Sequence, residues 1–163
     1  MDSKTLQRDP LEGPKYALEY LAAKQAQELT SESNDRIGIG VDIELIADIN
    51  IENETFVERN FTEAEQKYCN GRPNRHASFA GRWCAKEAIV KAISSLHPGR
   101  EKVWYKGDAA PLIDIEVLPA PSGAPFVVLH GDVKDAAAKA GASTVRVSIS
   151  HIDTFAIATA ITH

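Results

Sequence analysis

Two carboxylates, Asp42 and Glu44, end an apolar run in which Ile and Val alternate with glycines. The alternation is typical of a β-strand with one buried face, so side chains two positions apart point to the same side. Neighbouring carboxylates on one face repel each other, and a hard cation such as Mg²⁺ relieves that repulsion. Magnesium commonly uses one or two protein carboxylates and fills its remaining positions with water and phosphate oxygens. The spacing therefore fits a metal and phosphate site, although two solvated acids on an exposed strand explain it equally well.

A second group of charges lies on a segment with helical periodicity, which predicts one long helix over residues 74–96. At about 100° per residue, Arg82 and Lys86 fall inside the apolar arc of this helix, and Glu87 and Lys91 fall on its border. A charge at the edge of a core face needs a partner or a ligand. The plain alternative is that Glu87 and Lys91 form an ordinary i,i+4 pair. Arg82 and Lys86 would then bury only their aliphatic stems and keep their charged ends in water. Together with the strand carboxylates, the pattern favours metal-assisted phosphoryl chemistry.

His151 follows Ser148 and Ser150 at the end of another predicted strand. Its ordinary pKa near 6.5 leaves both protonation states accessible, so it could bond a phosphate or orient a substrate hydroxyl. A solvent-facing histidine is the commoner alternative. The sequence contains none of the glycine-rich signatures of P-loop proteins, dinucleotide-binding folds or esterases.

Composition limits the class of protein. A chain of 163 residues, 44% hydrophobic and 25% charged, is long enough for one globular domain with a short appendage. Its net charge of −5, without long runs of like charge, predicts neither a nucleic acid nor a membrane partner. Cys69 and Cys84 lack metal-ligand spacing, and no apolar run could span a bilayer, so we expect free thiols and a cytoplasmic protein.

The elements that must position these residues follow from periodicity and turn signals. Helices are predicted over residues 16–30, 53–60, 62–69, 74–96 and 133–140. Strands are predicted over residues 36–43, 112–118, 126–130, 144–150 and 155–161. The mixture predicts an α+β fold, in which a small antiparallel sheet packs against one long helix and several short ones. A polar stretch over residues 31–35 separates an N-terminal linker with one helix, residues 1–35, from the domain, residues 36–163.

Four motifs, met in chain order, resemble the 4′-phosphopantetheinyl transferases of the holo-acyl-carrier-protein-synthase type. They are Gly40-Val41-Asp42, Phe61-Thr62-x-x-Glu65, Trp83-x-x-Lys86-Glu87-Ala88-x-x-Lys91 and Ser148-x-Ser150-His151. The stretches over residues 50–53, 56–63 and 77–83 are most similar to the transferase domain at the C-terminus of the fungal type I fatty acid synthase α subunit. The resemblance covers about residues 36–162 and implies the holo-acyl-carrier-protein-synthase fold.

The resemblance implies a reaction in which CoA is the substrate and an acyl carrier protein is the partner. The CoA pyrophosphate is split, phosphopantetheine passes to a carrier serine, and 3′,5′-ADP leaves, which activates a fatty acid synthase complex. Small members of the family form trimers with CoA between subunits, so the isolated domain is expected to form a homotrimer. The alternatives are a CoA-binding scaffold domain without catalysis and an unrelated Mg²⁺-dependent nucleotide hydrolase.

The resemblance also implies a set of site residues. The expected metal ligands, around Mg²⁺ and the pyrophosphate, are Asp42, Glu44 and Glu87. The expected catalytic residues are Asp42, Glu87 and Lys91, with Lys91 steadying the leaving group. The residues expected to bind CoA are Tyr68, Ser78, Arg82, Lys86, Lys91, Ser150 and His151. The carrier serine needs a base, for which Glu87 or a metal-bound water is the candidate.

Two positions depart from the pattern of free-standing bacterial members. Those proteins carry an acid three residues after the first aspartate, where this chain has Leu45, and Glu44 lies at plus two instead. They also commonly follow the second lysine with Ala-x-Gly, whereas Ala92 is followed here by Ile93 and Ser94. The metal set and the loop over the nucleotide are therefore where this chain is expected to differ.

Overall fold

The structure, a computed structural model, describes residues 36–96 and 110–163. Its elements, in chain order, are β1 (Gly38–Leu45), the 3₁₀ helix η1 (Ile46–Asp48), α2 (Glu54–Asn60), α3 (Glu63–Asn70), α4 (Arg75–Ser95), the 3₁₀ helix η2 (Leu112–Asp114), β2 (Ile115–Pro119), β3 (Pro125–Leu129), α5 (Gly131–Ala140), β4 (Val145–His151) and β5 (Phe155–Thr162). The predicted order of helices and strands is confirmed for these residues. The helix predicted over residues 16–30 lies outside them.

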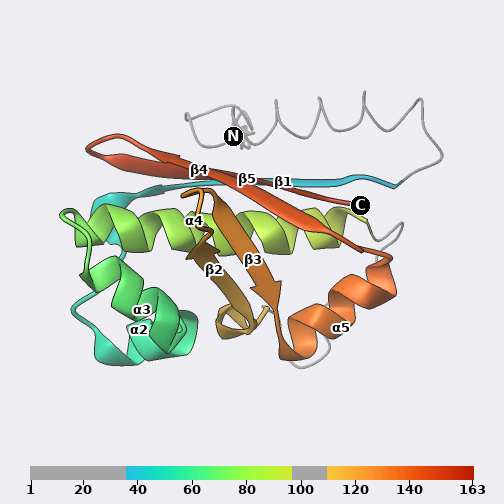
Figure 1. Cartoon of the computed structure of the whole chain (residues 1–163), viewed down its shortest axis with the longest axis horizontal. Coiled ribbons are helices and arrows are strands. Elements are labelled where there is room, and N and C mark those ends of the chain that lie inside the picture. The colour runs from blue at the N-terminus through green and yellow to red at the C-terminus, as the bar shows by residue number, and fades with distance from the viewer. Residues whose placement is uncertain (1–35, 97–109) are drawn as a thin grey trace, which may run out of the picture.

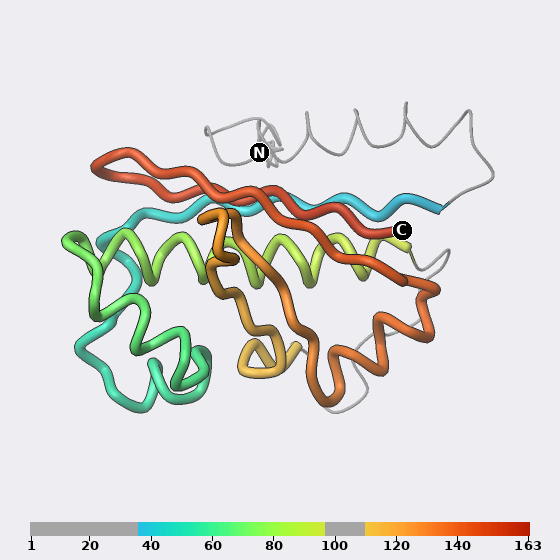
Figure 2. Tube along the Cα trace, viewed as in Figure 1, coloured from blue at the N-terminus to red at the C-terminus, as the bar shows by residue number. Residues whose placement is uncertain are grey.

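The strands form two antiparallel sheets, one of three strands in the order β1-β5-β4 and one hairpin of β2 and β3. The long helix α4 runs lengthwise under the three-stranded sheet (Figure 1). Helices α2 and α3 lie near one end of α4 and α5 near the other, with the β2–β3 hairpin between them (Figure 2). This arrangement confirms the predicted α+β class.

Strand β1 packs closely on α4 because its inward face begins with two glycines. A Cβ added to Gly40 would lie 2.0 Å from the Ala88 carbonyl oxygen, and one added to Gly38 would lie 2.3 Å from that of Ala92. The buried face is the one with Gly38, Gly40 and Asp42, while Ile39 and Ile43 are only half-buried.

Short polar side chains begin the helices where the sequence predicted them to begin. Asn53 and Asn74 accept hydrogen bonds from backbone N–H groups of the first turns of α2 and α4. Thr62 and Glu65 form the predicted capping box of α3. At the other end of a helix, Gly141 ends α5 with a φ of 84°, a backbone conformation that glycine adopts without strain.

Helix α4 is buried on two sides. Its apolar side chains, among them Phe79, Ile89 and Ile93, belong to the core between the sheet and the elements below it. Arg82 and Lys86 are also buried, as their position inside the apolar arc predicted. No helix in the described part of the chain is long and apolar enough to cross a membrane.

The outward face of the three-stranded sheet remains partly apolar. Leu45 and Phe155 are register partners at one end, and Ile39 and Ile161 are partners near the other. Of these four side chains, Leu45, Phe155 and Ile161 are among the exposed large hydrophobic residues. The sheet therefore presents apolar surface on the side that faces away from α4.

Candidate functional site

The first part of the site is the junction of β1 and α4. Lys91 Nζ donates to Asp42 Oδ1 at 3.1 Å and to the Val41 carbonyl oxygen at 3.0 Å. The Asp42 side chain is 3% exposed and that of Lys91 is 38% exposed. The pair therefore joins a carboxylate buried under the sheet to an ammonium group that solvent and ligands can still reach.

Glu44 lies two residues further along β1, so it shares the α4-facing side of the strand with Asp42. Both carboxylates act on the Cys84 thiol of α4. Burial raises the pKa of Cys84, and the negative charges of Asp42 and Glu44 raise it further. The thiol donates to the Ala156 carbonyl oxygen at 3.3 Å. Two predicted metal ligands therefore converge on one side of α4.

The donor set at this junction is one that magnesium uses. Within residues 36–96 and 110–163, no three His, Cys, Asp or Glu side chains form a group that could hold a metal ion by themselves. The predicted set of Asp42, Glu44 and Glu87 is thus not assembled as a ready three-carboxylate site. Magnesium needs only one or two carboxylates when substrate phosphates and water complete its shell, so these residues still fit the ion.

The second part of the site lies between α3 and α4, where three predicted CoA-binding residues come together. The Arg82 guanidinium stacks over the Tyr68 ring, 4.1 Å from its centroid. The same guanidinium donates to the Ser78 carbonyl oxygen at 3.2 Å and to Ser78 Oγ at 3.3 Å. Arg72, which the sequence did not single out, also lies over the Tyr68 ring, at 5.4 Å.

Not every N–H donor of the Arg82 guanidinium is used by the protein. Its Nε is buried and has no hydrogen-bond partner, and no ion pair to Arg82 occurs among the described residues. A guanidinium has five N–H donors, and phosphate oxygens are its preferred acceptors. The guanidinium therefore has N–H donors that no described protein atom uses.

Lys86 has a different placement from the one expected of a phosphate-binding residue. Its side chain is fully buried, and Nζ donates to Glu65 Oε2 at 2.7 Å, to the Asn60 carbonyl oxygen at 2.5 Å and to the Leu112 carbonyl oxygen at 3.0 Å. Burial lowers the pKa of Lys86, and the Glu65 charge opposes that shift. An ammonium group has three donors, and all three are occupied. In the structure Lys86 binds protein atoms rather than facing a ligand.

Ser150 and His151 lie on β4, two strands away from β1. The register pairs His151 with Ala156 and Ala156 with Glu44, so these three residues share the α4-facing side of the sheet. Ser150 pairs with Ile157 and faces outward. Both Ser150 and His151 are exposed. Tyr68, Ser78 and Arg82 together are called the Tyr68 cluster. No hydrogen bond or ion pair among the described residues joins Ser150 or His151 to this cluster.

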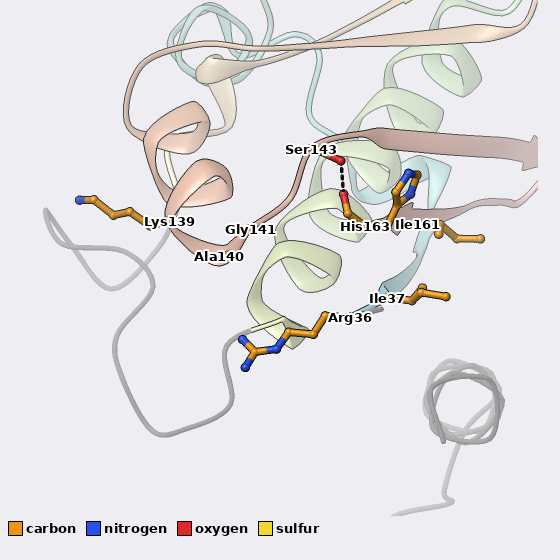
Figure 3. A pocket seen from close by; sticks show the side chains of 8 residues that line it. All are labelled: Arg36, Ile37, Lys139, Ala140, Gly141, Ser143, Ile161 and His163. Carbon is orange, nitrogen blue, oxygen red and sulfur yellow. Dashed lines mark hydrogen bonds between the residues drawn. The ribbon is translucent and has the colours of Figure 1, made fainter. Parts of the chain in front are cut away.

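A cavity of about 680 Å³ lies at the other end of the sheet (Figure 3). Arg36, Ile161 and His163 contribute to its lining, together with the end of α5 at Lys139. None of the predicted site residues lines it. The predicted site residues therefore lie at the β1–α4 and α3–α4 contacts and on β4, outside the lining of this cavity.

Comparison with known proteins identifies the family. A profile of the 4′-phosphopantetheinyl transferase superfamily matches residues 38–160. The fatty acid synthase subunit alpha of Schizosaccharomyces pombe is 51% identical over 134 residues, which are 82% of this chain and 7% of that protein. The Saccharomyces cerevisiae subunit is 46% identical over 139 residues, 85% of this chain and 7% of that protein. The chain thus corresponds to about 7% of the length of these relatives.

Solved structures show the same fold. The Chronobacterium ammoniagenes ACPS-CoA complex matches with a TM-score of 0.68 at 30% identity, over 79% of this chain and 98% of the other. The Helicobacter pylori holo-[acyl-carrier-protein] synthase in complex with coenzyme A matches with a TM-score of 0.60 at 29% identity, over 77% of this chain and 99% of the other. The chain belongs to the 4′-phosphopantetheinyl transferase superfamily and has the fold of the holo-acyl-carrier-protein synthases.

Proposed function

We propose that this domain transfers 4′-phosphopantetheine from CoA to a serine of an acyl carrier protein and thereby activates a fatty acid synthase. The serine Oγ attacks the phosphorus that carries pantetheine, and a new Oγ–P bond forms. The bond from that phosphorus to the bridging oxygen breaks, and 3′,5′-ADP leaves with the electron pair. The serine proton passes to a base of the enzyme.

The observation that carries the proposal is the Asp42–Lys91 pair at the β1–α4 junction. It places a buried carboxylate and a reachable ammonium group at one point, with Glu44 on the same face of β1. Phosphoryl transfer depends mainly on positioning and on stabilising charge at the phosphates. A junction with both signs of charge supplies both requirements, and family membership supports this assignment.

Each residue then has a role that its position allows. Asp42 and Glu44 would hold Mg²⁺, and Glu87 is the candidate third ligand. When bound, the ion neutralises charge on the phosphate oxygens. Lys91 stabilises the leaving phosphate of 3′,5′-ADP. The Glu87 carboxylate also lies on the helix face between Trp83 and Lys91, and it is our candidate to accept the serine Oγ proton.

The Tyr68 cluster binds the nucleotide part of CoA. Arg82 offers its free donors to phosphate oxygens, and the Tyr68 ring holds the guanidinium in place. Ser78 fixes the same guanidinium from the preceding turn of α4. The exposed Ser150 and His151 are proposed as further CoA contacts.

The relatives suggest the setting of the reaction. Because matches to the fatty acid synthase alpha subunits cover most of this chain, we propose a carrier domain of such a synthase as the acceptor. The apolar outward face of the sheet supports a homotrimer when the domain is isolated, with Ser150 and His151 contributed to a site shared between copies. A cytoplasmic location stays a prediction from the sequence.

Intact-mass analysis of an apo carrier domain incubated with this chain, CoA and Mg²⁺ tests the reaction directly. We expect a mass gain equal to one phosphopantetheinyl group, and loss of that gain with Glu87→Gln or after metal chelation. Glu58→Gln, an exposed glutamate on α2, is the matched control and should keep activity. A chain that binds CoA but never modifies the carrier would instead be a scaffold domain, and turnover of CoA without carrier would indicate a hydrolase.

A further inference from the structure

We infer that Lys86 and Glu65 form a positioning pair, which holds α3 against α4 so that Tyr68 and Arg82 stay together as a wall of the CoA site, and that Lys86 itself does not touch CoA. This inference rests on the proposed function, in which the Tyr68 cluster binds CoA. It assigns the first lysine of the Lys-Glu motif to the protein interior and leaves phosphate contact to Arg82 and Lys91.

Both members of the pair form their hydrogen bonds with protein atoms. Lys86 donates three hydrogen bonds, to Glu65, to Asn60 at the end of α2 and to Leu112 of η2. Glu65 accepts from Lys86 and from the Thr62 N–H through Oε2, and from the Val117 N–H of β2 through Oε1 at 2.9 Å. Five segments therefore meet at one buried ion pair, and no donor of Lys86 remains for a ligand.

The pair belongs to a row of three contacts between α3 and α4. Glu65 meets Lys86, Tyr68 meets Arg82, and Cys69 accepts from Ser78 Oγ at 3.3 Å. The numbers rise along α3 and fall along α4, so the two helices run in opposite directions at this contact. The Tyr68–Arg82 stack is the middle contact of the row. It is held on one side by the ion pair and on the other by the Cys69–Ser78 bond.

Helix α3 has few buried side chains. It has eight residues, and its fully buried side chains are Glu65 and Cys69, the two outer contacts of this row. Loss of the Glu65–Lys86 contact would leave a charge buried without its partner, which favours local displacement of the helix. Such a displacement would separate Tyr68 from Arg82 and weaken CoA binding without removing any ligand contact.

A double-mutant cycle separates positioning from direct contact. CoA affinity is measured by calorimetry with Mg²⁺ for the full chain, Lys86→Met, Tyr68→Leu and the double variant. If Lys86 acts through Tyr68, each single change weakens binding about tenfold and the double change weakens it no further. Additive losses, together with a lower salt dependence of binding in Lys86→Met, would show a direct phosphate contact and overturn the inference. Lys67→Met, an exposed lysine on α3, is the matched control and should bind normally.

A second readout needs no CoA and therefore distinguishes failure of this inference from failure of the proposed function. Cys69 lies in the α3–α4 row, and Cys84 lies on the sheet side of α4; both thiols are buried. In Lys86→Met we expect the ratio of the Cys69 rate to the Cys84 rate with iodoacetamide to rise about tenfold, because local opening of α3 exposes Cys69 alone, whereas global unfolding exposes both thiols. Equal acceleration of both thiols, or of neither, overturns the inference. Should Lys86→Met fail to fold, Glu65→Gln tests the same contact from α3 with the same expected outcomes.

Discussion

Two lysines of one motif, Lys86 and Lys91, lie on the same helix and have opposite environments. Lys86 faces α3 and is fully buried with Glu65, whereas Lys91 faces β1, pairs with Asp42 and keeps 38% of its side chain exposed. Five residues at about 100° each separate them by roughly 140° around α4, so they face different neighbours. Their distance in sequence does not predict their function; the side of the helix on which each one lies does.

Helix α4 thus carries on one side a charge that holds segments together and on another side a charge that a ligand can reach. On the α3 side, every proton of Lys86 has a protein acceptor, which suits a group that holds segments together. On the sheet side, Lys91 meets a carboxylate and a carbonyl oxygen but stays within reach of solvent. A ligand phosphate can approach the second charge and not the first.

The largest expected effect is on stability, from removing the buried charge. Lys86→Met should lower the free energy of unfolding by about 3–5 kcal/mol, because Glu65 keeps a buried charge without its partner. Lys91→Met should lower it by less, about 1–3 kcal/mol, because Asp42 loses its partner but the Lys91 end of the pair is open to solvent. Urea denaturation of both variants measures the difference. Equal losses would mean that the two pairs do not differ as their burial suggests.

For catalysis, the largest effect is expected at the β1–α4 junction. Asp42→Asn should lower the rate of carrier modification by roughly 100-fold or more, because a charge at the phosphates is removed. The fold should persist, since asparagine has nearly the same shape and can still accept from Lys91. Intact-mass kinetics and circular dichroism give the two quantities. A variant with normal turnover would contradict the assignment of this junction to the chemistry.

Gly40→Ala tests the close approach that creates the sheet-side site. Its Cβ would lie 2.0 Å from the Ala88 carbonyl oxygen and 2.6 Å from the Ala92 nitrogen, both backbone atoms that cannot rotate away. We expect a loss of about 1–3 kcal/mol in unfolding free energy and weaker activity, as β1 moves off α4. Gly71→Ala, whose added Cβ would make ordinary contacts at 3.5 Å, is the control in thermal unfolding. If both glycines tolerate alanine equally, β1 and α4 are not held as closely as the structure indicates.

The smallest expected effect is a pH dependence from Cys84. Its pKa is raised above the ordinary value of 9.0, so above pH 9.0 the unfolded thiol loses its proton while the folded thiol keeps it. The unfolded state then binds fewer protons, and the unfolding free energy falls as pH rises, by at most about 1.4 kcal/mol per pH unit. Urea denaturation at pH 8 and pH 10 measures this, with Cys84→Ala as control. An unchanged slope in the alanine variant would show that other groups cause the loss.

Much of the fold followed from local signals that need no tertiary context. The capping box at Thr62 and the asparagine before α4 begin helices, and the glycine after α5 ends one, close to the predicted bounds. Burial of Arg82 and Lys86 also followed from helical geometry alone. The exception was β1, where alternation identified a strand but not its buried side, because a glycine face packs a helix more closely than an isoleucine face can.

The course of each element follows from local signals in the chain, because caps, turns and periodicity act over a few residues. The partner of each charge follows from packing between elements that are distant in the chain. Glu65 appeared in the sequence as a helix cap, and packing made it also the partner of Lys86 across 21 positions. Lys91 gained Asp42 across 49 positions. Such partners depend on which faces of α4 are covered by α3 and β1, and that choice is made by the packing of the whole domain.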